Sequence, residues 1–187
     1  MLSKSSDDKT NYAFSLSFDR KSTHSLVFLS DDNTVMSNAF SKETPVADNS
    51  TGLVVDVGVI SRKKIDTYYY AGNFGWSFTI HNCLSYICLT AQHLISKTNK
   101  PIKIMSLTNT GGTTVTGRLG FFVNMNRNEF SVIDKDTSKI LYTLTRVVST
   151  DQLCLAFGVY NAKLVAAKLE ILYSYDFTTL PITYVIA

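Results

Sequence analysis

Hydrophobic and polar residues alternate with a period of two over much of this 187-residue chain from residue 53 onward. In LVVDVGVIS (53–61), Val55, Val57 and Val59 share one face, as in a strand with one side in a core. Polar links separate the runs, and VNMNRNEF and IDKDTSKI have the form of hairpin connections. Further strands are expected within 67–80 (two short runs), 102–107, 113–124, 129–133, 140–147, 153–159 and 163–177.

The last two of these segments are the most regular. In residues 166–177, one face is formed by Leu169, Ile171, Tyr173 and Tyr175. We expect this strand to pair antiparallel with 153–159, whose inward residues would be Leu153, Leu155, Phe157 and Val159. The apolar tail LPITYVIA (180–187) is expected to lie along the domain or to reach into another copy of the chain.

HNCLSYICLTAQHLISK (81–97) departs from the strand pattern. Its apolar residues recur at helical spacing, in a stripe formed by Leu84, Ile87, Cys88, Ala91 and Leu94 or Ile95. Asn82 or Ser85 is placed to cap its start, so a helix is predicted over 82–97. A single helix cannot provide the crossovers of a parallel sheet. The pattern therefore predicts an all-β fold, an antiparallel β-sandwich or barrel with one inserted α-helix.

Residues 1–51 are rich in Ser, Asp, Asn and Lys. Phe14, Leu16 and Phe18 alternate with serines, so this segment can add a strand to a sheet but is too polar to form a core alone. We expect an extended N-terminal arm over 1–51, which orders against its own body or a neighbouring copy, and a folded domain over 52–187. A plain flexible terminus is the alternative for the arm.

The formal charge is divided unevenly between these two parts. Residues 1–51 hold 5 basic and 7 acidic side chains, whereas residues 52–187 hold 13 basic and 8 acidic ones. The expected folded body is mildly basic, which favours a polyanionic partner, although scattered surface lysines would give the same total. No apolar run approaches the ~18 residues of a membrane-spanning helix, so no membrane partner is expected.

The cysteines and histidines form no recognisable chemical motif. Cys83, Cys88 and Cys154 are odd in number, and the first two are five positions apart, so buried reduced thiols are expected rather than a disulfide or a zinc knuckle. Cys83 lies close in sequence to His81 and His93, but nothing around it resembles a cysteine-protease context. The Gly-rich turn NTGGTT lacks the lysine of a phosphate-binding loop. Neither an enzyme nor a cofactor is expected.

Two stretches bear on binding. Arg62, Lys63 and Lys64 form the densest basic cluster and are placed to contact phosphates without reading bases, while a solvated rim is the alternative. YYYAGNFGW (68–76) holds aromatic side chains on which bases or sugars could stack, but sandwich packing explains most of them equally well. Neither stretch identifies a ligand.

The last third of the chain, STDQLCLAFGVYNAKLVAAKLEILYSYDFTTLPITYVIA, resembles the closing strand pair and tail of jelly-roll coat proteins. The coats in question come from small icosahedral positive-strand RNA plant viruses, the bromoviruses and cucumoviruses and more loosely the tymoviruses. In those families a strand pair like 153–159 and 164–176 precedes a short apolar tail. A mobile leader precedes about eight strands, and a helix interrupts the strand order, as 82–97 would do. Chain length also agrees.

This resemblance implies an antiparallel jelly-roll sandwich that assembles with itself into an icosahedral shell around a genome, with the virion and the host cytoplasm as its locations. Inter-subunit contacts would then involve Phe14, Leu16, Phe18, Tyr184, Val185 and Ile186. Genomic RNA, bound without regard to sequence, would face Arg62, Lys63 and Lys64. Bromovirus-like coats begin with an arginine-rich arm that the net-acidic residues 1–51 lack. RNA contact would therefore come from the inner body surface or depend little on a basic arm.

Two other functions remain open. A ligand-binding or carbohydrate-binding β-sandwich, for instance a lectin-like module, would use Tyr68, Tyr69, Tyr70 and Trp76. A jelly-roll-derived viral movement or accessory protein would bind single-stranded nucleic acid cooperatively without closing into shells.

Overall fold

The computed structural model describes residues 16–23, 27–37, 54–65, 75–83, 86–93, 102–108, 117–160 and 168–172. These residues form one 3₁₀ turn, η1 (Arg20–Ser22), and one short helix, α1 (Arg62–Ile65). The strands are β1 (Phe28–Leu29), β2 (Val35–Ser37), β3 (Val54–Ser61), β4 (Gly75–Cys83), β5 (Tyr86–His93), β6 (Ile102–Thr108), β7 (Leu119–Asn124), β8 (Glu129–Asp134), β9 (Lys139–Thr145), β10 (Leu153–Tyr160) and β11 (Lys168–Glu170). Within this part of the chain, no helix is long and apolar enough to cross a membrane.

The largest sheet has five antiparallel strands in the order β10-β3-β4-β5-β6. Alternation along β3 places Val55, Val57 and Val59 on one face, as the sequence predicts, and all three side chains are buried. Strand pairing extends this face sideways, because Phe78 lies opposite Val57 and Ala91 lies opposite Phe78. This apolar face forms one side of the hydrophobic core.

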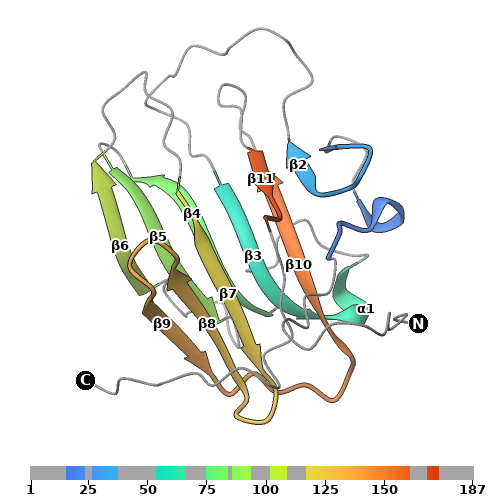
Figure 1. The fold of residues 1–187 in the computed structure, drawn as a ribbon. Helices are drawn as coiled ribbons and strands as arrows, with labels where there is room; N and C mark the ends of the chain where they lie inside the picture. The colour runs from blue at the N-terminus through green and yellow to red at the C-terminus, as the bar shows by residue number, and fades with distance from the viewer. Residues whose placement is uncertain are drawn as a thin grey trace, which may run out of the picture.

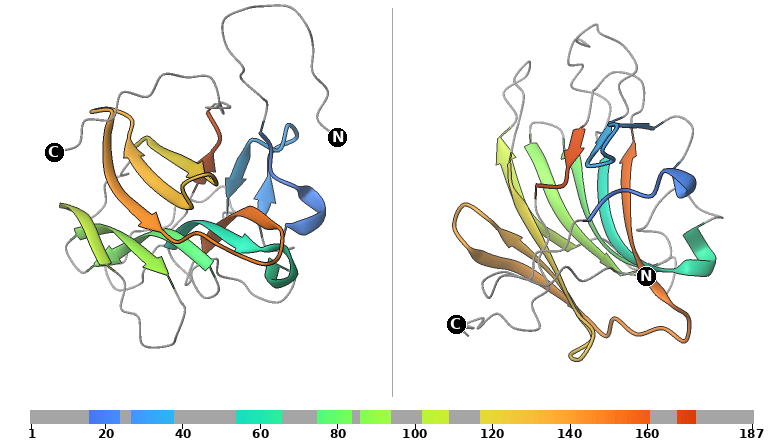
Figure 2. Two further views of the ribbon diagram at one scale, coloured as in Figure 1. Left: turned by 90° about the horizontal axis from the view of Figure 1, so that it is seen from below. Right: turned by 45° about the vertical axis from the view of Figure 1, so that its right-hand side comes forward.

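A second sheet, in the order β7-β8-β9, lies over this face, as Figure 1 and Figure 2 show. Phe130 and Val132 of β8 are fully buried against the main sheet. The ring of Phe78 lies 4.9 Å from that of Phe130 and 6.1 Å from that of Phe121, measured between centroids. These separations are typical of favourable aromatic pairs. The two layers thus form a β-sandwich with an aromatic centre.

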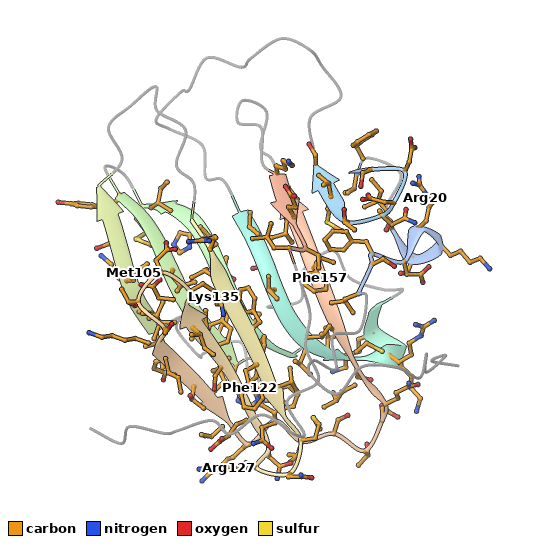
Figure 3. All side chains as sticks on the ribbon, viewed as in Figure 1. Arg20, Met105, Phe122, Arg127, Lys135 and Phe157 are labelled. Atoms are coloured by element: carbon orange, nitrogen blue, oxygen red, sulfur yellow. A yellow bond between two sulfur atoms is a disulfide. The ribbon has the colours of Figure 1, made fainter. Side chains whose placement is uncertain are left out.

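A third sheet, in the order β1-β2-β11, joins segments from both ends of the chain beside β10 (Figure 1). Its apolar residues Leu29 and Met36 pack on Val55 of the main sheet. Phe18 is also buried in this cluster, and its ring lies edge to face with that of Phe157, 5.2 Å away between centroids. Figure 3 labels Phe157 on β10. The described part of residues 1–51 therefore lies within the fold of the chain itself.

The expectation of an all-β antiparallel sandwich is confirmed. Hairpins join β7 to β8 and β8 to β9 at the two predicted connections, where Asn128 and Ser138 adopt φ values of 55° and 56°. The jelly-roll order is not confirmed. A jelly roll interlocks two Greek keys, whereas β3 to β6 pair in sequence order and β10 returns beside β3.

The prediction of a helix over 82–97 is wrong in its described part, because β4 and β5 run through it as a hairpin. Ile87 and Ala91 fall on a helical stripe, but together with Leu89 they also alternate along the core face of a strand. Cys88 on the opposite face is apolar and buried as well, so the run fits a helical stripe as well as a strand and its periodicity alone does not decide between them.

The expected pairing of 153–159 with 164–176 is also wrong in its described part. β10 pairs along its whole length with β3, and β11, the described part of the later segment, pairs with β2. The inward face of β10 is correct at Phe157 and Val159, whereas Leu155 is largely exposed. Alternation shows which face of a strand is buried, but it does not identify the neighbouring strand.

The expectation of three reduced thiols is wrong for two of them. Cys83 and Cys88 form a disulfide with a Cα–Cα distance of 5.9 Å. Antiparallel pairing of β4 with β5 places Cys88 opposite His81, which is two residues before Cys83, so the two cysteines are diagonal neighbours. Cys154, on β10, is a free and half-buried thiol. The spacing of five between Cys83 and Cys88 does not by itself predict the pairing of β4 with β5 that brings them together.

Candidate functional site: a cavity beside Trp76

A cavity of about 430 Å³ opens where β3, β4, β5 and β10 meet α1. Strand pairing brings its walls together, because Leu153 lies opposite Ser61 and Trp76 lies opposite His93. The remaining walls come from Lys64, Gly75 and the segment 148–151. Residues that are remote in sequence thus line one space.

Trp76 and His93 form the aromatic wall. Their rings stack with 4.6 Å between centroids and 18° between planes. Burial lowers the pKa of His93, so its imidazole is neutral at physiological pH and offers one donor and one acceptor. The side chain of Trp76 is buried, and its indole Nε1–H has no acceptor among the described residues. A buried donor without an acceptor is costly, so this N–H is a weak point of the local packing.

Gly75 is required at the start of β4. A Cβ atom at this position would collide with the carbonyl oxygen of Val59 on the neighbouring strand. Glycine alone permits this close approach of the two backbones, and it sets the position of Trp76 immediately after it. The geometry of the aromatic wall therefore depends on a residue without a side chain.

Asp151 forms the polar wall. Its carboxylate accepts hydrogen bonds from Lys63 Nζ at 2.6 Å and from Ser61 Oγ at 3.2 Å. The Lys63 hydrogen bond is the main reason that the pKa of Asp151 lies below its usual value. The backbone N–H of Arg62 donates to the carbonyl of Gln152 at 2.8 Å. These bonds fasten α1 to the segment before β10 and present a carboxylate at the cavity.

The predicted basic cluster is α1 itself. Arg62, Lys63 and Lys64 are all exposed at the surface. Lys63 is paired with Asp151, which offsets part of the positive charge, and Lys64 lines the cavity. The cluster and the cavity are thus one neighbourhood, a relation that the sequence patterns did not indicate.

The structure describes only some of the other predicted site residues. Trp76 lines the cavity, whereas Tyr68, Tyr69 and Tyr70 lie outside the described residues. Phe18 is buried in the core cluster of the third sheet, and Leu16 is half-buried. The remaining predicted contact residues, Phe14, Tyr184, Val185 and Ile186, also lie outside the described part of the chain.

Two cavity residues have no motif around them. His93 falls within the stretch 82–97, which the sequence predicts to be a helix, and Asp151 lies 88 positions from its partner Lys63. The alternation in β4 and β5 would have placed Trp76 and His93 on one face if the hairpin had been recognised. No comparable signal exists for Asp151.

Comparison with models of known protein families finds no match, and a search of curated protein sequences finds none either.

Proposed function

We propose that this chain is a viral coat protein that assembles with itself into an icosahedral shell around a genome. The proposal starts from the sequence resemblance of residues 149–187 to plant-virus coats. Of the features that this resemblance implies, the antiparallel β-sandwich supports the proposal, whereas the strand pairing of β10 and β11 and the strands in place of the expected helix do not. A jelly-roll relationship is part of the proposal. The shell function needs neither a cofactor nor a catalytic group, but it does need surfaces on which copies can join.

The observation that carries this proposal is a pair of open strand edges. Within the described residues, β6 pairs only with β5 and β9 pairs only with β8. Both edges lie on the same side of the sandwich, as Figure 1 and Figure 2 show. Ile102 on β6 and Ile140 on β9 are each 49% exposed. Strand edges that have no partner among the described residues, with exposed isoleucines beside them, are surfaces to which another strand can add. The proposed occupant is a second copy of the chain.

Genome contact is proposed at α1. Arg62, Lys63 and Lys64 would meet phosphates, and Lys63 also pairs with Asp151. Replacing Arg62 and Lys64 by alanine should reduce the slope of log affinity against log salt by about one unit for each side chain that binds a phosphate in the wild type. The expected decrease in affinity should be similar for different RNA sequences, because phosphate contacts carry no sequence information.

The test is negative-stain electron microscopy of the purified chain, with light scattering and the ratio of nucleic-acid to protein absorbance. Uniform closed particles would support the proposal, and a monomer at every salt concentration and pH would overturn it. Ile102→Lys combined with Ile140→Lys should prevent assembly, because each added charge would be buried in the interface between two copies of the chain. Met125→Lys is the control, since Met125 is equally exposed but lies in the turn between β7 and β8.

A ligand-binding β-sandwich is the second candidate, and the cavity beside Trp76 favours it. An aromatic wall and a carboxylate suit a small polyhydroxylated ligand such as a hexose. Trp76 is the one tryptophan of the chain, so intrinsic fluorescence reports on this cavity directly. Titration with monosaccharides should change this emission, and Asp151→Asn should weaken the change. Emission that no sugar alters would exclude these ligands.

A further inference from the structure

The outer face of the main sheet carries a cluster of sulfur and nitrogen atoms at the β4–β5 hairpin. His81 and Cys83 alternate along β4, so they point to the same face, and Cys88 lies opposite His81 on β5. Cys83 Sγ is 3.2 Å from His81 Nε2. The imidazole and both sulfur atoms offer ligand atoms that all lie within 4.8 Å of one another.

This is the ligand set of a soft divalent cation. Zn²⁺ binds thiolate sulfur at about 2.3 Å and imidazole nitrogen at about 2.0 Å in a tetrahedral arrangement. Two such ligands of one ion are therefore roughly 3.5–3.8 Å apart. The 3.2 Å between Cys83 and His81 is already close to this separation. Neighbouring strands hold the three side chains close together, and after reduction the two sulfur atoms would separate from their bond to about 3.8 Å.

Burial adds to the case. Cys88 is fully buried, whereas His81 and Cys83 are half-buried, so the cluster has one sheltered side and one accessible side. An ion can enter from the accessible side, and the sheltered thiolate would be shielded from bulk solvent. Three protein ligands leave the fourth tetrahedral position for water or another donor.

We propose that His81, Cys83 and Cys88 form a Zn²⁺ site in the reduced protein, and that the Cys83–Cys88 disulfide is its oxidised, metal-free state. A thiol reductant supplies two electrons and two protons, which cleave the S–S bond to two thiols, while the reductant is oxidised to its own disulfide. Zn²⁺ then displaces both thiol protons and binds two thiolates and the neutral imidazole. The inference is independent of the coat-protein proposal, because it concerns the state of one hairpin.

The experiment compares the oxidised and reduced protein. Each form is dialysed against Zn²⁺ without reductant carry-over, and bound metal is measured. The reduced form should retain one Zn²⁺ per chain and the oxidised form none. Co²⁺ in place of Zn²⁺ should give the visible bands of a tetrahedral ion and a near-ultraviolet thiolate-to-cobalt charge-transfer band. Reduced protein that stays folded by circular dichroism but retains no metal would overturn the proposal.

Variants separate the proposed ligands from the other thiol. Cys154→Ser is the matched control and should retain the metal. Cys154 lies on β10 opposite Ile60, whereas His81 lies opposite Val54 at the other end of β3. His81→Asn, Cys83→Ser and Cys88→Ser should each lower Zn²⁺ affinity at least as much as the ~10–100-fold that loss of an outer-shell partner costs. If Cys154→Ser loses the metal while His81→Asn keeps it, the assignment is wrong.

Discussion

At the scale of single residues, the most unusual group is a carboxylate inside the main sheet. Asp56 is only 3% exposed, on the same strand as the buried valines but on the opposite face. The hydroxyl of Thr79, at the facing position of β4, donates a hydrogen bond to the carboxyl oxygen of Asp56. Burial raises the pKa of Asp56, and the Thr79 hydrogen bond and the charge of His81 offset this only in part. Burial therefore favours the neutral, protonated form of the Asp56 side chain.

The pH dependence of Asp56→Asn tests this burial. The folded pKa lies above the ordinary value of 3.8, so the folded state holds the proton over a pH range in which the unfolded state has lost it. The contribution of Asp56 to the free energy of unfolding is therefore complete below about pH 4, and it is lost as pH rises through the folded pKa. The free energy of unfolding of Asp56→Asn should rise relative to wild type from acid to neutral pH, as measured by urea titration.

Asp134→Asn is the control with the opposite sign. Hydrogen bonds from Thr137 and from the backbone N–H of Asp136 lower the pKa of Asp134. Its contribution to stability is present above about pH 4 and is lost as pH falls through the folded pKa. The variant should be less stable than wild type at neutral pH and should approach it in acid. Two variants with the same trend would contradict the assignment for Asp56.

At the scale of elements, hairpins organise most of the fold. The turn between β8 and β9 uses Asp134 as a side-chain acceptor for the backbone N–H groups of Asp136 and Thr137. Ser138 completes this turn in the left-handed region, with φ of 56°. This conformation costs an ordinary residue about 1 kcal/mol, whereas Asn tolerates it better. The hairpin therefore stores a small strain that substitution can release.

Ser138→Asn should raise the free energy of unfolding by up to about 1 kcal/mol, because it relieves the left-handed strain without the entropy cost of glycine. Ser138→Ala keeps the strain and should not stabilise the protein. Thermal melting of both variants beside wild type provides the measurement. Equal melting temperatures for Ala and Asn would show that the turn is not strained.

At the scale of the whole molecule, Phe18 links the third sheet to the main sheet. Its ring meets Phe157 of β10 and is buried in the cluster that includes Leu29 and Met36. The segment 16–37 thus shares its core with strands more than a hundred residues later in the chain. Deleting this ring leaves a cavity at the junction, and such deletions of buried aromatic rings cost about 3–5 kcal/mol.

Phe18→Ala should lower the free energy of unfolding by about 3 kcal/mol, which denaturant titration would measure. Phe28→Ala is the matched control, because Phe28 lies on β1 of the third sheet, against which Phe18 packs, but is 50% exposed. Its removal should cost less than about 1 kcal/mol. Equal effects of the two substitutions would show that residues 16–37 are not anchored through Phe18.

The two-residue alternation and the turn residues by themselves determined the all-β class, the hairpins of β7 to β9 and the buried face of β3. They could do so because these features depend on neighbours in sequence. Only the tertiary structure decided that 86–93 is a strand, that β10 lies beside β3 and that Trp76, His93 and Asp151 line one cavity. Those features depend on contacts between remote segments. A short run such as 86–93 fits a helical stripe as well as an alternating strand, so periodicity alone could not choose between them.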